Sequence, residues 1–190
     1  MSSKKRRRKL ILLLICLLTV IGLLLVVEKA AEKSHGESSE ESVSYTLMNI
    51  VASDVEEIGM IRKDEESYNL KKEGESWMCL EDSLFKIDSD TINIFLENAA
   101  ALSSDIKIED ATDLEQYGLT DPFINLTLQT ENNMYVIKVG NYNSVISAYY
   151  VQINDDPIVY TINSSQYYQL NKTLEDFELI EESSLGEATE

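Results

Sequence analysis

The side chains best able to do chemistry gather in one stretch, "DLEQYGLTDP", residues 113–122. Asp113, Glu115 and Asp121 supply three carboxylates, and Tyr117 adds a phenol. Groups of these types, when held together, can exchange protons with a substrate or bind a partner. The stretch is therefore a candidate site. The competing interpretation is a turn that only redirects the chain.

The same stretch has the residue order of a capped helical turn. Thr112 and Glu115 have the spacing of a capping box, in which each side chain binds the other residue's backbone amide. One helical turn over residues 113–117 would follow. Gly118 would end that turn at a positive φ, a conformation that costs glycine little.

The residues after this turn also suit a structural role. Leu114 and Leu119 occupy the two positions that pack together when a helix ends in a Schellman motif. Pro122 pushes Asp121 toward an extended conformation and so starts a strand at Phe123. Because every residue then has a local structural role, we favour the turn over the site.

Elsewhere the sequence offers little for catalysis. The only histidine, His35, precedes the predicted domain, so no Ser-His-Asp or Cys-His arrangement is available within it. Cys79 is expected to be a small core residue. Asp88 and Asp90 are expected to cap a helix, because a calcium loop would also need a glycine and a closing glutamate. We expect no catalytic, cofactor-binding or metal-binding residues and no enzymatic activity.

The tyrosines are the one feature that suggests binding. Seven of the ten tyrosines lie between residues 135 and 168. Tyrosine offers a large contact area with little side-chain entropy to lose, so a tyrosine-lined sheet can bind a protein or a glycan. Tyr142, Tyr150 and Tyr168 are the candidates for outward-facing positions. Tyrosine also suits β-strands for purely structural reasons.

The N-terminus has the pattern of a membrane anchor. Six basic residues at positions 4–9 precede an uncharged run at residues 10–27. Such a run makes a helix of about 27 Å, close to the thickness of the bilayer core. The basic residues favour the cytoplasmic side, which places the rest of the chain outside the membrane. A cleaved signal peptide is the alternative, but its apolar region usually has only about 7–15 residues.

The predicted organisation follows from this anchor. Residues 1–9 form a basic cytoplasmic N-terminus, and residues 28–44 form a flexible acidic tether that spans about 23 Å. Residues 181–190 are predicted to be a disordered tail. Beyond residue 9, 10 basic residues face 34 acidic ones, which leaves a charge of −24 (10 minus 34). A body of this charge repels nucleic acid, so we expect no nucleic-acid partner.

Residues 45–180 are predicted to form one α+β domain. Short strands with alternating apolar residues predict antiparallel β-meander sheets, and their apolar face needs a cover. Amphipathic helices at residues 90–103 and 165–171 can supply that cover. The order strand, strand, strand, helix occurs over residues 58–103 and again over 134–171. The two βββα halves would fit a degenerate duplication.

Several of these segments resemble the bacterial family known as domain of unknown function 4340. The likeness rests on "DLEQYGLTDP" followed by an alternating strand, then "IKVGN", then "YYVQIN…IVYTI". Trp77, for which we expect a buried position, lies in the earlier matching segment "SYNLKKEGESWMCLED". The resemblance covers about residues 45–178. It implies an extracytoplasmic position behind an N-terminal anchor. It also implies an association with ABC-type transport systems or gliding-type accessory systems. It implies no catalytic residues.

Three classes of function follow for a chain of this kind. The first is a membrane-tethered extracytoplasmic interaction or assembly domain, a non-enzymatic accessory of an envelope or ABC-type transport complex with a protein partner. The second is an envelope module that binds a glycan or a peptide. The third is a hydrolase. A flat or edge-strand apolar patch would favour the first class, and a pocket lined by convergent carboxylates would favour the third.

Overall fold

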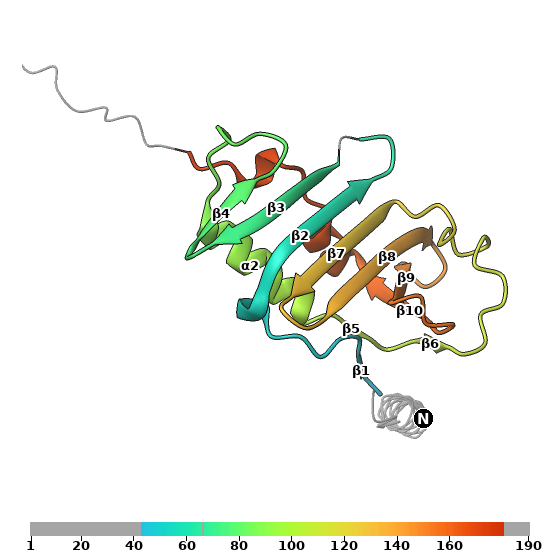
Figure 1. Ribbon diagram of the computed structural model, residues 1–190. Helices are drawn as coiled ribbons and strands as arrows, with labels where there is room; N and C mark the ends of the chain where they lie inside the picture. Colours follow the sequence, from blue (N-terminus) through green and yellow to red (C-terminus); the bar gives the residue numbers. More distant parts are fainter. Residues whose placement is uncertain (1–42, 66, 181–190) are drawn as a thin grey trace, which may run out of the picture. The chain divides into compact units, whose positions relative to one another are not determined.

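The structure, a computed structural model, describes residues 43–65 and 67–180 (Figure 1). Its strands are β1 (Tyr45–Thr46), β2 (Val55–Arg62), β3 (Tyr68–Glu73), β4 (Ser76–Cys79), β5 (Ser103–Ser104), β6 (Lys107–Ile108), β7 (Ile124–Thr130), β8 (Met134–Asn143), β9 (Ala148–Ile153) and β10 (Val159–Asn163). Its helices are α2 (Ser89–Ala100), α3 (Ser164–Leu170) and the 3-10 helices η1 (Ala52–Asp54) and η2 (Glu175–Phe177). The predicted α+β class is confirmed.

One antiparallel sheet of eight strands dominates this part of the chain. Its strand order is β4-β3-β2-β7-β8-β9-β10-β6, and β1 and β5 form a separate two-stranded ladder. The order βββα occurs twice, as β2-β3-β4-α2 and as β8-β9-β10-α3. Strand β7 lies between β2 and β8. The strands of each set follow one another in chain order from β7 toward one edge of the sheet. A duplication of the chain stays a prediction.

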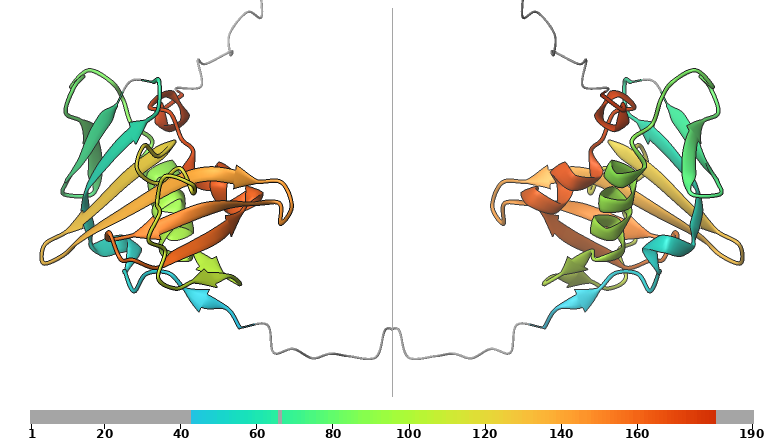
Figure 2. Two further views of the ribbon diagram at one scale, coloured as in Figure 1. Left: turned by 90° about the vertical axis from the view of Figure 1, so that its right-hand side faces the viewer. Right: turned by 90° about the vertical axis from the view of Figure 1, so that its left-hand side faces the viewer.

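Both α-helices pack on the same side of the sheet. They lie behind it in Figure 1, and the views in Figure 2 agree. The first helix begins at Ser89 because the Asp88 carboxylate accepts hydrogen bonds from the backbone amides of Asp90 and Thr91, at 3.0 and 3.4 Å. Its apolar residues at helical spacing face the sheet, and four of them are buried: Ile92, Phe95, Leu96 and Ala99.

The main core fills the space between the sheet and these helices. The inward residues of the strands alternate with polar ones, and Ile58, Leu126 and Ile137 are almost completely buried. Trp77 is buried with 5% of its surface exposed, as expected from its sequence context. The indole Nε1 of Trp77 is buried without a hydrogen-bond acceptor, so this side chain contributes to the fold through packing.

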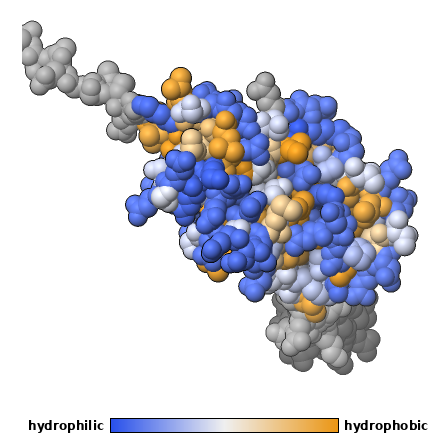
Figure 3. Space-filling model, in the orientation of Figure 1, coloured by the Kyte–Doolittle hydropathy of each residue, from blue (hydrophilic) through white to orange (hydrophobic). Residues whose placement is uncertain are grey.

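The opposite face of the sheet is covered only in part. On β2, β3 and β7 it carries polar and charged side chains such as Glu57 and Lys71, whose carboxylate and ammonium lie 2.6 Å apart. Figure 3 views this face, and its surface is mainly hydrophilic. Near β9 and β10 the face is covered, because Ala111 and Leu119 pack on Val159 there and form a second, smaller apolar cluster.

Several predictions concern residues outside the described part of the chain. These are the basic N-terminus at 1–9, the anchor at 10–27, the tether at 28–44 apart from its last two residues, and the tail at 181–190. Within residues 43–180, apart from position 66, no helix is long and apolar enough to cross a membrane.

Candidate functional site

Four tyrosine rings from β8, β9 and α3 form a continuous row. The ring centroids of Tyr142 and Tyr149 lie 4.9 Å apart, those of Tyr149 and Tyr167 lie 3.8 Å apart, and those of Tyr167 and Tyr168 lie 5.5 Å apart. The planes of the middle pair differ by only 5°, so these two rings stack face to face. The row joins α3 to the β8–β9 hairpin. It leaves its two end rings, Tyr142 and Tyr168, 47% and 64% exposed.

A β-bulge in β8 brings Tyr142 into this row. Val139 pairs with Val151, and the next pair is Tyr142 with Tyr149, so β8 has one more residue than β9 between the two pairs. Successive side chains of a strand point to opposite faces of the sheet. One extra residue therefore moves each side chain that follows it in β8 to the other face. Without the bulge, Asn141 would occupy the position that Tyr142 takes.

Glycine at position 140 makes this bulge possible. A β-carbon on Gly140 would collide with the carbonyl oxygen of Tyr117 and would lie 3.0 Å from that of Gly118. The backbone amide of Asn141 donates a 2.8 Å hydrogen bond to the same Tyr117 oxygen. The turn around Gly118 therefore packs backbone against backbone on the bulge, which only a residue without a side chain permits.

The β8–β9 turn and α3 complete one exposed surface. Figure 2 shows this turn projecting from the sheet, with α3 beside it. Val145 and Ile146 in the turn are 90% and 40% exposed. We define the tyrosine surface by the side chains of Tyr142, Val145, Ile146, Tyr149, Tyr167 and Tyr168.

The helix that carries two of these tyrosines is fixed by its own first turn. The side chain of Asn163 accepts a hydrogen bond from the backbone amide of Gln166 at 3.0 Å, and the Gln166 side chain accepts one from the backbone amide of Asn163 at 3.1 Å. The Nε2 of Gln166 also donates to the carbonyl oxygen of Ser103 at 3.0 Å. These contacts hold Tyr167 against the hairpin.

Of the three tyrosines proposed from the sequence, the structure brings together two. Tyr150 follows Tyr149 on the strand and therefore points to the opposite face. Its ring lies 4.8 Å from that of Tyr117, and its hydroxyl accepts a 2.6 Å hydrogen bond from Asn143 Nδ2. Tyr150 thus belongs to the contact between the Gly118 turn and the sheet. Tyr149 and Tyr167 are not among the tyrosines predicted from the sequence, because the row depends on the bulge and on how α3 packs.

The stretch "DLEQYGLTDP" forms the Schellman ending that its sequence predicts. Gly118 has a φ of 69° and donates its amide to the carbonyl oxygen of Glu115 at 2.9 Å. The amide of Leu119 donates to the carbonyl oxygen of Leu114 at 3.0 Å. Leu119 is 2% exposed in the smaller apolar cluster, and Leu114 packs at the edge of that cluster. Beyond Pro122, β7 begins at Ile124, one residue after the predicted start.

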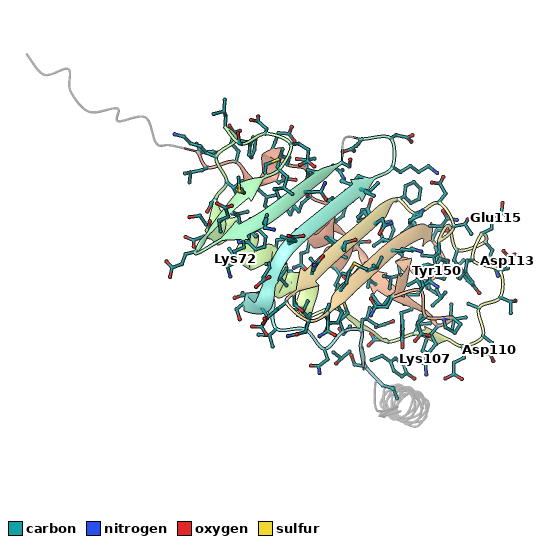
Figure 4. The ribbon with its side chains drawn as sticks, viewed as in Figure 1. Lys72, Lys107, Asp110, Asp113, Glu115 and Tyr150 are labelled. Atoms are coloured by element: carbon teal, nitrogen blue, oxygen red, sulfur yellow. The ribbon has the colours of Figure 1, made fainter. Side chains whose placement is uncertain are left out.

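The predicted capping box between Thr112 and Glu115 is not formed. Instead the Asp113 carboxylate accepts a hydrogen bond from the backbone amide of Glu115 at 3.2 Å. Within the described residues no hydrogen bond joins Thr112 to Glu115. An aspartate side chain readily binds the amide two residues ahead, so Asp113 takes the role expected of Thr112. Asp113 and Glu115 project from the loop near Tyr150 (Figure 4).

Comparison with known proteins identifies a family. Residues 77–179 match the model of the family described as domain of unknown function (DUF4340), which is more than half of the chain. The chain belongs to this family. No match was found among curated proteins or among solved structures. The matched part of this DUF4340 chain begins at Trp77 and includes the Gly118 turn, the bulge and the whole tyrosine surface.

The part of this DUF4340 domain that forms the tyrosine surface is almost free of charge. Between residues 139 and 171 the only charged residues are Asp155 and Asp156, and their turn lies at the end of β9 away from the β8–β9 turn. Burial raises the pKa of the Tyr149 and Tyr167 phenols, so both stay neutral at physiological pH. The six side chains of the tyrosine surface therefore present aromatic, aliphatic and hydroxyl groups and carry no charge, while the charges of Arg62 and Glu65, which pair with each other, act on Tyr167 from β2 and the turn after it.

A polar hollow of about 710 Å³ lies elsewhere on this domain, beside the β2–β3 turn. Its carboxylates come from Asp64, Glu65, Glu81, Asp82 and Glu175. Three other polar side chains of its wall, those of Arg62, Tyr68 and Thr173, are engaged with the protein itself. Arg62 pairs with Glu65 and donates its Nε to Asn171, and the Tyr68 hydroxyl donates to the carbonyl oxygen of Lys172 at 2.9 Å.

Proposed function

We propose that this protein is an interaction domain that binds a partner protein through its tyrosine surface. The observation that carries this proposal is an uncharged, exposed aromatic surface on a strongly acidic body. Between residues 43 and 180, 8 basic residues face 25 acidic ones, which leaves −17 (8 minus 25). The centres of protein interfaces are depleted in charge and enriched in tyrosine, and the tyrosine surface has both properties.

The ring geometry favours a protein over a glycan as the ligand. Sugar rings bind to the exposed faces of aromatic side chains. In the tyrosine row the faces of Tyr149 and Tyr167 cover each other at 3.8 Å. The middle of the row therefore presents ring edges and hydroxyl groups, which suit the mixed polar and apolar contacts of a protein interface.

The position of the domain in the cell is part of the same proposal. The basic residues 4–9 and the uncharged run 10–27 support a single-pass anchor in the cell membrane with the C-terminal domain on the extracytoplasmic side. The tether at residues 28–44 would let the domain meet a partner within about 23 Å of the membrane. The sequence resemblance supports an accessory, non-enzymatic role in an envelope or ABC-type transport complex.

Site-specific photo-crosslinking in native membranes tests this function. The full chain carries p-benzoylphenylalanine at position 145 or 168 in the tyrosine surface, or at the control positions Leu84 and Ile94. The two control side chains are 88% and 59% exposed, which makes them as accessible as Val145 and Tyr168. We expect a discrete adduct with another protein from positions 145 and 168 and none from the control positions. Equal adducts from all four positions, or none from 145 and 168, would refute the proposed function.

A further inference from the structure

The tyrosine surface is assembled from two separate parts of the chain. The β8–β9 hairpin carries four of its side chains, and α3 carries the other two, Tyr167 and Tyr168. The two parts meet at the stacked rings of Tyr149 and Tyr167. A partner that covers both parts binds best when α3 is already held at one position beside the hairpin, because no ordering cost then remains to be met on binding.

Arg62, the last residue of β2, contacts the C-terminal end of α3. Its side chain lies on the helix side of the sheet, like those of Ile58 and Met60, and only 11% of it is exposed. Its Nε donates a 2.9 Å hydrogen bond to Oδ1 of Asn171, the residue that ends α3. Burial raises the pKa of the Tyr167 phenol and the positive charge of Arg62 opposes that rise, so Arg62 also lies close to this phenol.

Resting on the proposed function, we infer that Arg62 is a positioning residue for partner binding, which keeps Tyr167 and Tyr168 aligned with the hairpin through its bond to Asn171. Tyr167 and Asn171 are four positions apart and are joined by a 2.9 Å backbone hydrogen bond, so they share one face of α3. A contact that fixes Asn171 therefore also fixes Tyr167. The helix has only seven residues, and a helix this short depends on contacts with the rest of the fold for its position.

The surroundings of Arg62 favour a role in alignment over a role in stability. Its guanidinium reaches Glu65 through one nitrogen and Asn171 through another, so two contacts fix the direction of a rigid, planar group. Removing a charge from water is costly, and an apolar side chain in its place often leaves the stability of a fold nearly unchanged. The bond from the Tyr68 hydroxyl to the carbonyl oxygen of Lys172 still attaches the end of α3 to the core when Arg62 is replaced.

Four variants of the full chain test the bond from both of its ends. Arg62→Met removes the guanidinium and keeps an unbranched apolar stem. Asn171→Ala removes the acceptor, whereas Asn171→Asp keeps an oxygen for the same hydrogen bond. Lys172→Ala is the matched control, because its side chain makes no hydrogen bond or ion pair with the residues that the structure describes. Asn171 is half-buried at the end of α3, so its variants decide the inference even if Arg62→Met lowers stability.

Partner binding is measured with p-benzoylphenylalanine at position 145 in native membranes. This position lies in the hairpin, so a lower adduct yield there reports a loss of the partner and not a local change at α3. We expect the yield to fall at least about threefold in Arg62→Met and Asn171→Ala, and by less than about 1.5-fold in Asn171→Asp and Lys172→Ala.

The position of α3 is measured separately by hydroxyl-radical oxidation of the purified full chain in detergent. Tyr149 and Tyr167 cover each other's faces in the native row. Their oxidation should rise in Arg62→Met and Asn171→Ala, because a displaced α3 uncovers these rings, and it should stay at the wild-type level in Asn171→Asp and Lys172→Ala. This readout does not depend on any partner.

Each of four other outcomes would overturn the inference. An adduct yield that is unchanged in Arg62→Met and Asn171→Ala would leave the proposed function intact and show that Arg62 has no part in it. Equal losses in Asn171→Ala and Asn171→Asp would mean that the acceptor oxygen is not what holds α3. Oxidation of Tyr149 and Tyr167 at the wild-type level in every variant would show that the bond does not position the helix. The absence of any adduct from the wild-type sequence around position 145 would remove the proposed function and this inference together.

Discussion

Gly74 and Gly118 have nearly the same backbone conformation but different surroundings. Their φ angles are 64° and 69°, in the left-handed region that favours glycine. A β-carbon on Gly74 would meet no atom within 4 Å, whereas one on Gly118 would collide with the Asn141 side chain and lie 2.9 Å from the Asn141 backbone nitrogen. The positive φ at Gly118 follows from the sequence pattern. Its close contact with Asn141 does not, because that contact depends on a residue in a strand 23 positions further along the chain (141 minus 118).

Substitution of these glycines separates backbone strain from steric collision. We expect Gly74→Ala to lower the free energy of unfolding by about 1 kcal/mol, the cost of a left-handed alanine. Gly118→Ala should cost more, because the turn must also move away from the bulge at Gly140. Urea unfolding of the two variants measures the difference. Equal losses would mean that the contact between the turn and β8 contributes nothing to stability.

Trp77 gives a direct optical test of the core. It is the only tryptophan in the chain and is 5% exposed, so its fluorescence should have the short-wavelength maximum of a buried indole. Trp77→Ala should lower the free energy of unfolding by about 3–5 kcal/mol, because it leaves a large cavity. Trp77→Phe should cost less, since the indole Nε1 has no hydrogen bond to lose. An emission maximum typical of tryptophan in water would contradict this packing.

At the level of elements, the sequence predicts helices and strands better than their contacts. Apolar spacing places the two helices within a few residues of α2 and α3, since an amphipathic face is a local property. The bulge at Gly140 is not predicted, although "VGNYN" contains the glycine that it needs. Alternation therefore gives the correct face for Val139 and Val151, but it cannot show that Tyr142 has moved to the side of the helices.

The N-terminus of α2 predicts a pH dependence. Hydrogen bonds from the Thr91 hydroxyl and from backbone amides hold the pKa of the Asp88 carboxyl below its ordinary value. A lowered pKa means that the ionised cap stabilises the fold above the pKa of an unfolded aspartate, and that this contribution is lost as the pH falls through the folded-state pKa. We expect the difference in free energy of unfolding between wild type and Asp88→Asn to shrink as the pH falls from about 6 to about 2.

A matched variant controls for the general effect of acid on this protein. Glu131→Gln removes an exposed carboxylate in the β7–β8 turn that accepts no hydrogen bond from the described residues. The Asp88→Asn difference from wild type should change more over the same pH range than the Glu131→Gln difference does. If the two differences change equally, the Asp88 carboxylate does not cap α2 in solution.

At the scale of the whole molecule, charge and aromatic residues are distributed unequally. The 8 basic and 25 acidic residues of positions 43–180 almost avoid the segment that forms the tyrosine surface. The sequence shows this segregation and the concentration of tyrosines, and so it predicts that a surface exists. It cannot show which tyrosines share that surface. Tyr150 is separated from Tyr149 by strand alternation, while Tyr167 arrives from a helix whose position depends on the packed core.

Hydroxyl-radical footprinting of the full chain tests the central claim most directly, because it needs no knowledge of the partner. Oxidation of Tyr142, Tyr168, Leu84 and Ile94 is compared between native membranes and the protein purified in detergent. All four side chains are between 47% and 88% exposed in the isolated chain. We predict that the two tyrosines are oxidised several-fold less in native membranes, whereas Leu84 and Ile94 react equally in both samples. Tyrosines that react equally in both samples would contradict the account, since their surface would then be open to water where the protein works.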